Sequence, residues 1–177
     1  MDELTETTAV VLRQNTLDQL PKEIEVPRYD RAALRPGIVH IGLGNFHRAH
    51  QAWYLHSLMQ QGMAYDWAII GAGVRAGDAI MRDKLLAQDC LTTLVELGPD
   101  GTSATVCGSM IDFLPVEEDN AALIAQMADP AIRIVSLTVT EGGYFLNPAT
   151  GTFDAEHPDI RHDATNPRHP RTAFGAI

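Results

Sequence analysis

The sequence is poor in cysteine and has no long apolar run. Cys90 and Cys107 are the only cysteines among 177 residues, too few for a disulfide framework or a cysteine metal site. We therefore expect reduced thiols and a cytoplasmic location. No apolar run approaches the length of a membrane span. The N-terminus carries acidic residues and lacks the features of a signal peptide, so we expect no membrane partner.

Positive charge is also scarce. The chain has 13 lysine and arginine residues against 23 acidic ones, a formal net charge of -10. Basic residues form no block, which argues against nucleic acid as a partner. An anionic cofactor stays open, because backbone N–H groups can bind phosphate without a positively charged surface.

What the sequence has is an alternation of apolar runs and helical stripes. Strands are predicted at 38–41, 66–74 and 132–140, each a nearly continuous apolar run typical of a strand buried on both faces. Helices are predicted at 46–61, 78–88 and 117–128. This order predicts an α/β fold of Rossmann type, with a mostly parallel sheet and helices on both faces.

Other segments are predicted by their turn residues and composition. The stretch "GPDG" at 98–101 predicts a hairpin, or two strands joined by a short turn. Residues 1–35 read as an N-terminal arm, extended around its prolines, and 36–177 as the domain. Residues 147–170, with four prolines and no sustained periodicity, read as loop, in which His157, His162 and His169 are expected to be solvated surface residues.

The stretch "HIGLGNFHRAH" (40–50) joins a buried strand to a helix through two glycines. Gly42 permits a tight turn, and Gly44 lets the backbone approach a pyrophosphate. The helix that follows offers unpaired N–H groups, and Arg48 could add charge for a phosphate. Where the dinucleotide-binding pattern has a third small residue, this chain has His47. A tight structural turn is the alternative interpretation.

Histidines in the same stretch raise the alternative of a metal site. His47 and His50 are three residues apart and would share one face of a continuous helix. A third ligand is missing, since His56 lies in poor registry with them. We therefore predict no metal, and expect hydrogen bonding or cofactor contact instead.

The motifs "GLGNFHRAHQAWY" and "VSLTVTEGGYF" together resemble the mannitol dehydrogenase family, the polyol-specific long-chain dehydrogenases and the related hexuronate reductases. The resemblance runs from about Leu17 to the last residue. It implies an oxidoreductase whose Rossmann-type N-terminal part binds NAD and acts on a polyol or ketose. The alternative is a nucleotide-binding or structural α/β module without catalysis of its own.

The resemblance also implies that the catalytic lysine, with its asparagine and histidine partners, lies in a helical C-terminal domain. We expect that domain and the last strands of the cofactor domain beyond residue 177, so the catalytic residues are unknown. This chain alone is expected to be an inactive N-terminal fragment.

Cofactor preference depends on the loop after the second strand. NAD-preferring members resemble "RSED" there, whereas this chain has Arg75, Ala76, Gly77 and Asp78. One carboxylate would accept the ribose hydroxyls and repel a 2′-phosphate, so NAD is favoured, and Arg75 could accommodate NADP. The predicted cofactor-binding residues are Gly42, Leu43, Gly44, Asn45, Phe46, His47, Arg48, Arg75, Asp78, Thr140 and Glu141.

Overall fold

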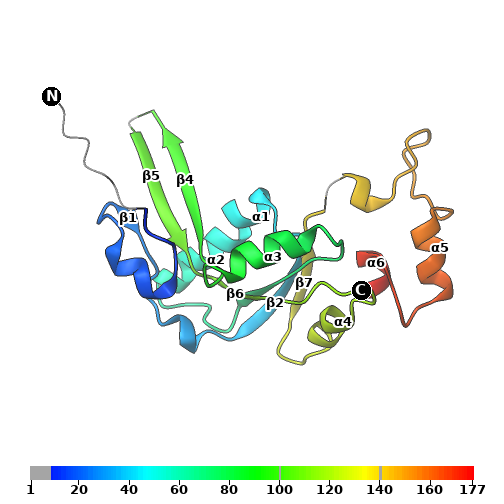
Figure 1. Cartoon of the computed structure of the whole chain (residues 1–177), viewed down its shortest axis with the longest axis horizontal. Helices are drawn as coiled ribbons and strands as arrows, with labels where there is room; N and C mark the ends of the chain where they lie inside the picture. Colours follow the sequence, from blue (N-terminus) through cyan, green and yellow to red (C-terminus); the bar gives the residue numbers. More distant parts are fainter. Residues whose placement is uncertain (1–8, 100, 140) are drawn as a thin grey trace.

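Four parallel strands form the central sheet of the molecule (Figure 1). The computed structural model describes residues 9–99, 101–139 and 141–177, with Glu141 described by its backbone alone. The strands are β2 (Pro36–Ile41), β3 (Ala68–Ala72), β6 (Met110–Phe113) and β7 (Ile134–Leu137). Their order in the sheet is β6-β3-β2-β7. Strands β3 and β6 follow β2 on one side and β7 lies on its other side, so the strand order reverses between β2 and β7. The predicted parallel α/β sheet is confirmed.

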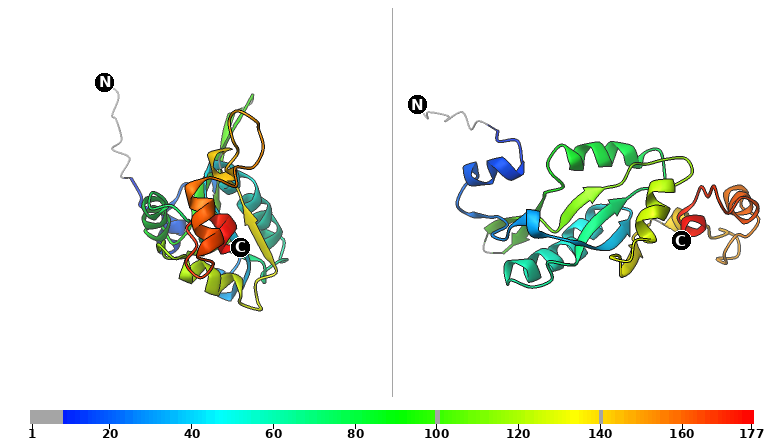
Figure 2. Two further views of the ribbon diagram at one scale, coloured as in Figure 1. Left: turned by 90° about the vertical axis from the view of Figure 1, so that its right-hand side faces the viewer. Right: turned by 90° about the horizontal axis from the view of Figure 1, so that it is seen from below.

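Helices cover both faces of this sheet, as predicted (Figure 2). On one face, Ile38 packs with Ala52 and Leu85; on the other, Val39 packs with Leu123. Alternate residues of β2 therefore point to opposite faces, which explains why the strand is apolar throughout. The helices are α1 (Asn45–Ala49), α2 (Gln51–Gln60), α3 (Asp78–Leu86), α4 (Ala121–Met127), α5 (Pro158–Thr165) and α6 (Ala173–Ala176).

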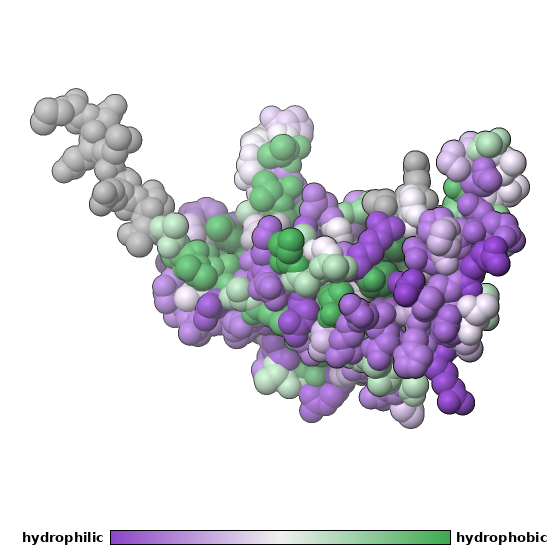
Figure 3. Space-filling view, turned by 45° about the vertical axis from the view of Figure 1, so that its right-hand side comes forward, coloured by the Kyte–Doolittle hydropathy of each residue, from purple (hydrophilic) through white to green (hydrophobic). Residues whose placement is uncertain are grey.

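A second, smaller sheet contains the predicted hairpin. Strands β4 (Thr92–Gly98) and β5 (Gly101–Cys107) pair antiparallel, and the short β1 (Ile24–Glu25) pairs parallel with β5. The hairpin projects from the body of the molecule (Figure 1). It carries apolar side chains into solvent, Val95 at 52% exposure and Leu97 at 84% (Figure 3).

The N-terminal arm packs on the domain. It contains two 3-10 helices, η1 (Gln14–Gln19) and η2 (Arg31–Ala33), and buries Tyr29 and Leu34. The Arg31 guanidinium donates to the carbonyl oxygens of Gly108, at 2.9 Å, and Met110, at 2.7 Å. Arg31 thus ties the arm to the segment between β5 and β6. The division of the chain at residue 35 stays a prediction.

The single helix predicted at 46–61 is wrong, because the structure divides it into α1 and α2. The backbone of His50 leaves the helical region, with φ -119° and ψ -83°. The His50 Nδ1 atom lies 2.8 Å from the Phe46 carbonyl oxygen, a local hydrogen bond at the break. His47 is buried and His50 is exposed, but both line one cavity beside β7, so the two side chains share a face as expected.

Two further expectations need correction. The strand predicted at 132–140 is parallel but not buried, because β7 is the edge of the sheet, and Ile134 and Val135 are 43% and 37% exposed. The segment 147–170 is not all loop, since it contains α5. Pro158 occupies the first turn of α5, where its missing N–H is tolerated, and the His157 ring nitrogen accepts a hydrogen bond from the Asp159 N–H at 3.2 Å.

Within the described part of the chain, every helix is too short or too polar to cross a membrane.

Candidate cofactor site

A cleft of about 240 Å³ lies at the carboxyl ends of β2, β3 and β7. In an open parallel sheet, ligands bind at the carboxyl ends of the strands. They bind preferentially where the strand order reverses, which in this sheet is between β2 and β7. Three loops line the cleft: the β2–α1 turn (Gly42, Leu43, Gly44), the β3–α3 loop (Val74, Arg75, Asp78) and the end of β7 (Thr138, Val139). Five of the predicted site residues therefore lie together.

Gly42 makes the first bend of the β2–α1 turn. Its φ is +92°, in the region that side chains disfavour, and its N–H donates to the Ala72 carbonyl at 3.0 Å. A Cβ at this position would lie 2.5 Å from the Thr138 carbonyl oxygen. Both the backbone angle and the close approach of β7 thus require glycine here.

Leu43 and Gly44 also line the cleft. The Leu43 side chain is buried against Gly71, where a Cβ would lie 2.5 Å from it. Gly44 has an ordinary φ of -71°, and a Cβ there would meet nothing within 4 Å. The fold itself therefore does not require glycine at position 44. A side chain there would fill open space at the cleft, so the glycine keeps that space free for a ligand.

The other predicted residues of the turn, Asn45, Phe46, His47 and Arg48, form α1, and none of them is among the residues that line the cleft. The Arg48 guanidinium donates to the Asn45 side-chain oxygen, and the Phe46 ring is 67% exposed. Their side chains are placed away from the cleft, so cofactor contact by them stays a prediction.

His47 is buried and stacks on His40 of β2, with ring centroids 3.6 Å apart and planes inclined by 15°. Burial lowers the pKa of His40 to about 4, and burial together with the neighbouring His40 lowers that of His47 to about 3. Both rings are therefore neutral at physiological pH. His40, which sequence analysis passed over as a strand residue, belongs to the structure of this site.

Asp78 holds the β3–α3 loop in place. Its carboxylate Oδ2 accepts from the Val74 N–H and the Arg75 N–H, both at 3.0 Å. Asp78 also stands in the first turn of α3, where a negative charge favours the helix dipole. A Cβ on Gly73 would clash with the Asp78 side chain, so the glycine lets the carboxylate approach the loop.

Thr140 lies outside the described residues, and so does the side chain of Glu141, which begins the 3-10 helix η3 (Glu141–Tyr144). Their contact with the cofactor stays a prediction. The cleft also contains residues that sequence analysis missed, namely Ile41, Ala72, Val74, Met81, Phe113, Thr138 and Val139. Position at a strand end could have indicated Thr138 and Val139, whereas Phe113 ends β6, a strand that was not separated in the sequence from the β-prone residues after the turn at 98–101.

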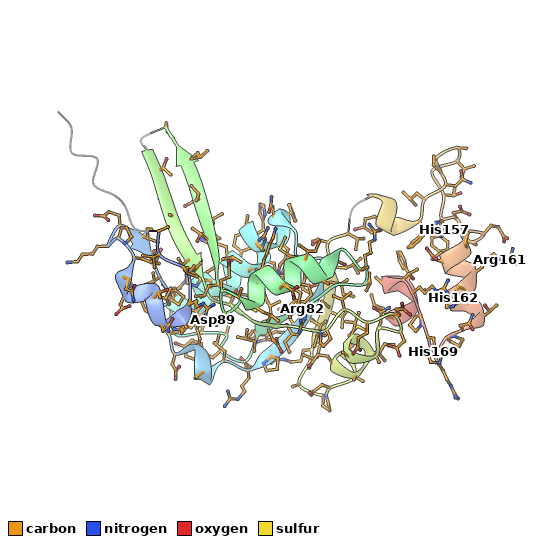
Figure 4. The ribbon with its side chains drawn as sticks, viewed as in Figure 1. Arg82, Asp89, His157, Arg161, His162 and His169 are labelled. Carbon is orange, nitrogen blue, oxygen red and sulfur yellow. The ribbon has the colours of Figure 1, made fainter. Side chains whose placement is uncertain are left out.

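Among the described residues, no group of three or more histidine, cysteine, aspartate or glutamate side chains is arranged to hold a metal ion. His157, His162 and His169 lie around α5, at the end of the molecule away from the hairpin (Figure 4). His162 contacts the buried Asp163 carboxylate at 3.2 Å, so this histidine takes part in packing rather than being simply solvated.

The model of the mannitol dehydrogenase Rossmann domain matches residues 36–177. The chain belongs to the mannitol dehydrogenase family. The resemblance of the two sequence motifs is thereby confirmed. Family membership does not favour the alternative of a purely structural module.

Relatives agree with this assignment. Mannitol 2-dehydrogenase of Cereibacter sphaeroides is 61% identical over 89% of this chain and 33% of that protein. Polyol:NADP oxidoreductase of Gluconobacter oxydans is 42% identical over 94% of this chain and 35% of that protein. Pseudomonas fluorescens mannitol 2-dehydrogenase, solved as a ternary complex with NAD and D-mannitol, superposes with a TM-score of 0.87, at 49% identity over 93% of this chain and 34% of that one. The chain thus spans about a third of the length of these relatives.

Proposed function

We propose that this chain is the NAD-binding part of an oxidoreductase that acts on a mannitol-like polyol, and that the cofactor binds in the cleft described above. The observation that carries the proposal is the meeting of a glycine turn and a carboxylate-bearing loop at the carboxyl ends of parallel strands. The buried, unpaired thiols of Cys90 and Cys107 favour a reducing location, the cytoplasm.

The residues of the cleft fit a dinucleotide. Among the described residues, no protein acceptor takes the N–H of Leu43 or of Gly44, so both are available to pyrophosphate oxygens. The open space at Gly44 permits that approach. Across the cleft, Oδ1 of Asp78 is left to accept from the ribose hydroxyls, while its charge disfavours a 2′-phosphate.

Bound NAD would supply a hydride acceptor for the alcohol carbon of the polyol, with the ketose as product. The chain's own part is to fix the position of the cofactor, through the turn and through Asp78. The group that moves the hydroxyl proton is predicted to lie in the C-terminal domain, and we assign no residue of this chain to that step.

Calorimetric titration with NAD, which measures the dissociation constant, tests the proposal. Gly44→Val places a branched side chain in the pyrophosphate path without backbone strain, so we expect at least a tenfold rise in Kd, about 1.4 kcal/mol. Gly98→Val in the hairpin is the matched control, since a Cβ there meets only ordinary contact at 3.5 Å. A folded Gly44→Val variant with parental affinity would contradict the proposed site.

A further inference from the structure

The orientation of the peptide bond after Gly42 is not fixed by the glycine itself. Glycine permits the bend at φ +92°, but it also permits many other conformations, so something else must fix the orientation of the peptide after it. The structure provides an anchor on β7. The Thr138 hydroxyl donates to the Gly42 carbonyl oxygen at 2.8 Å, across 96 residues of sequence.

This bond determines the proton positions on the neighbouring imidazole. A threonine hydroxyl has a single hydrogen, and Thr138 gives it to the Gly42 carbonyl, which can only accept. The contact of 2.9 Å between Thr138 Oγ1 and His40 Nε2 must therefore be donated by the histidine. His40 is neutral, so its Nδ1 is an acceptor and takes the hydrogen of the Ser136 hydroxyl, at 2.8 Å.

The same logic extends to His47. Since Ser136 has used its hydrogen, the Gln51 side-chain amide donates to the Ser136 oxygen over a long 3.5 Å. The Gln51 carbonyl oxygen then accepts from His47 Nδ1 at 3.1 Å. That leaves Nε2 of His47 as a bare lone pair, in agreement with its lack of any hydrogen-bond partner in the structure.

We propose that Thr138 is a positioning residue for the cofactor turn, held by a one-way chain of hydrogen bonds that runs from His47 through Gln51, Ser136 and His40 to the Gly42 carbonyl. This inference rests on the proposed binding of NAD in the cleft. This series of hydrogen bonds joins the turn to the end of β7, and therefore spans the point where the strand order reverses.

The consequence for the cofactor follows from the planar peptide. In a trans peptide the carbonyl and the N–H point in opposite directions. Holding the Gly42 carbonyl towards Thr138 therefore directs the Leu43 N–H away from β7, and prevents the peptide from turning over. Without the anchor, the free turn would populate orientations in which that N–H cannot meet a pyrophosphate oxygen.

The test compares three variants with the parent. Thr138→Val removes the hydroxyl but keeps the shape, and we expect NAD to bind about tenfold more weakly. Thr138→Ser restores the hydroxyl and should stay within threefold of the parent. Thr16→Val is the control, since this hydroxyl also donates to a backbone carbonyl, Val11, at 2.7 Å, but at an exposed place in the N-terminal arm.

A second measurement separates positioning from a merely structural role. In protein labelled with ¹⁵N-histidine, long-range ¹H–¹⁵N correlation spectra report which ring nitrogen carries the proton. We expect the proton of His40 on Nε2 and that of His47 on Nδ1 in the parent. Thr138→Val should change the His40 signals, whereas Thr16→Val should leave both rings as in the parent.

Each outcome has a definite meaning. Parental NAD affinity in Thr138→Val, an equal loss in Thr138→Ser, or an Nδ1 proton on His40 in the parent would each overturn the inference. If Thr138→Val does not fold, Ser136→Ala provides the test, with an expected two- to threefold loss of NAD affinity that parental affinity would contradict. A parent that does not bind NAD overturns the proposed function and this inference with it, whereas a binding parent with an unaffected variant overturns only the inference.

Discussion

The β2–α1 turn and the β3–α3 loop face each other across one cleft. The hydrogen bonds that hold them differ in the sequence separation of their partners. The turn is anchored by the Thr138 hydroxyl, 96 residues away in sequence, and by the buried imidazole behind it. The loop is anchored by the carboxylate of Asp78, three and four residues beyond the N–H groups that it accepts. The shape of the turn therefore depends on the assembled sheet, whereas the loop is shaped by its own sequence.

The largest effect should come from a Cβ in the turn. Gly42→Ala combines an unfavourable φ of +92° with a clash against the Thr138 carbonyl, so we expect a loss of about 2–4 kcal/mol in the free energy of unfolding. Gly44→Ala, two residues on, meets open space and should change stability by less than about 0.5 kcal/mol. Urea unfolding of both variants measures the difference.

An equal loss in the two glycine variants would contradict the account of the turn. It would mean that the β2–α1 segment tolerates or rejects side chains uniformly, instead of bending at Gly42 against β7.

Lowering the pH should weaken the support of the turn, because buried imidazoles lie behind it. Burial lowers the folded-state pKa of His40 to about 4 and that of His47 to about 3, so between pH 6.5 and these values the unfolded chain binds more protons than the folded one. The stabilisation by neutral imidazole is complete above pH 6.5 and is lost as the pH falls. At pH 5.5 the loss should reach up to about 1.4 kcal/mol for each ring, relative to pH 7.

Urea unfolding at pH 7 and at pH 5.5 measures this loss. The double variant His40→Asn/His47→Gln should show a flatter pH dependence, because it removes two of the titrating rings. A parent and a double variant with the same pH dependence would show that these histidines titrate normally in the folded state.

On the loop side, Asp78→Ala should have two effects. The loss of two accepted N–H bonds should lower the free energy of unfolding by about 1 kcal/mol. The loss of the charge should raise the preference for NADP over NAD about tenfold, because the repulsion of a 2′-phosphate disappears. Unfolding in urea and the ratio of the two dissociation constants measure these effects separately.

Asp78→Asn separates the two roles of the carboxylate. It keeps an oxygen that can accept from the Val74 and Arg75 N–H groups, but it has no charge. We expect near-parental stability with the changed cofactor preference. An unchanged ratio of NAD to NADP affinity in both variants would place Asp78 outside the ribose site.

The same difference in range explains what the sequence could predict. Gly42, Gly44, Arg75 and Asp78 were predicted for this site, and the structure brings all four to the cleft, because short patterns next to strand ends carry that information. Thr138 was missed as part of the turn, since nothing in "VSLTVT" tells which hydroxyl will face a carbonyl 96 residues away.

Errors in the fold have a similar cause. The break at His50 lies within an apolar stripe that is continuous in the sequence, and only the local backbone and its bond to Phe46 end α1 there. The exposure of β7 depends on its place at the sheet edge, which an apolar run does not reveal. Helix α5 was missed because Pro158 was taken as a loop signal, although proline is also favoured in a first turn.

The smallest effect on stability should come from Arg75. Its N–H is held by Asp78, but its side chain is exposed and reaches over Gly143, where a Cβ would lie 3.5 Å from Nη2. Arg75→Ala should therefore change the free energy of unfolding by less than about 0.5 kcal/mol. If the guanidinium accommodates a 2′-phosphate at the mouth of the cleft, the variant should bind NADP about threefold more weakly and NAD as before.

Arg75→Lys keeps the charge and should retain most of the NADP affinity. Calorimetric titration with both cofactors decides the matter: an equal loss for NAD and NADP would mean that Arg75 contacts a part of the cofactor that the two share, and the distinction between a turn for the pyrophosphate and a loop for the ribose would fail.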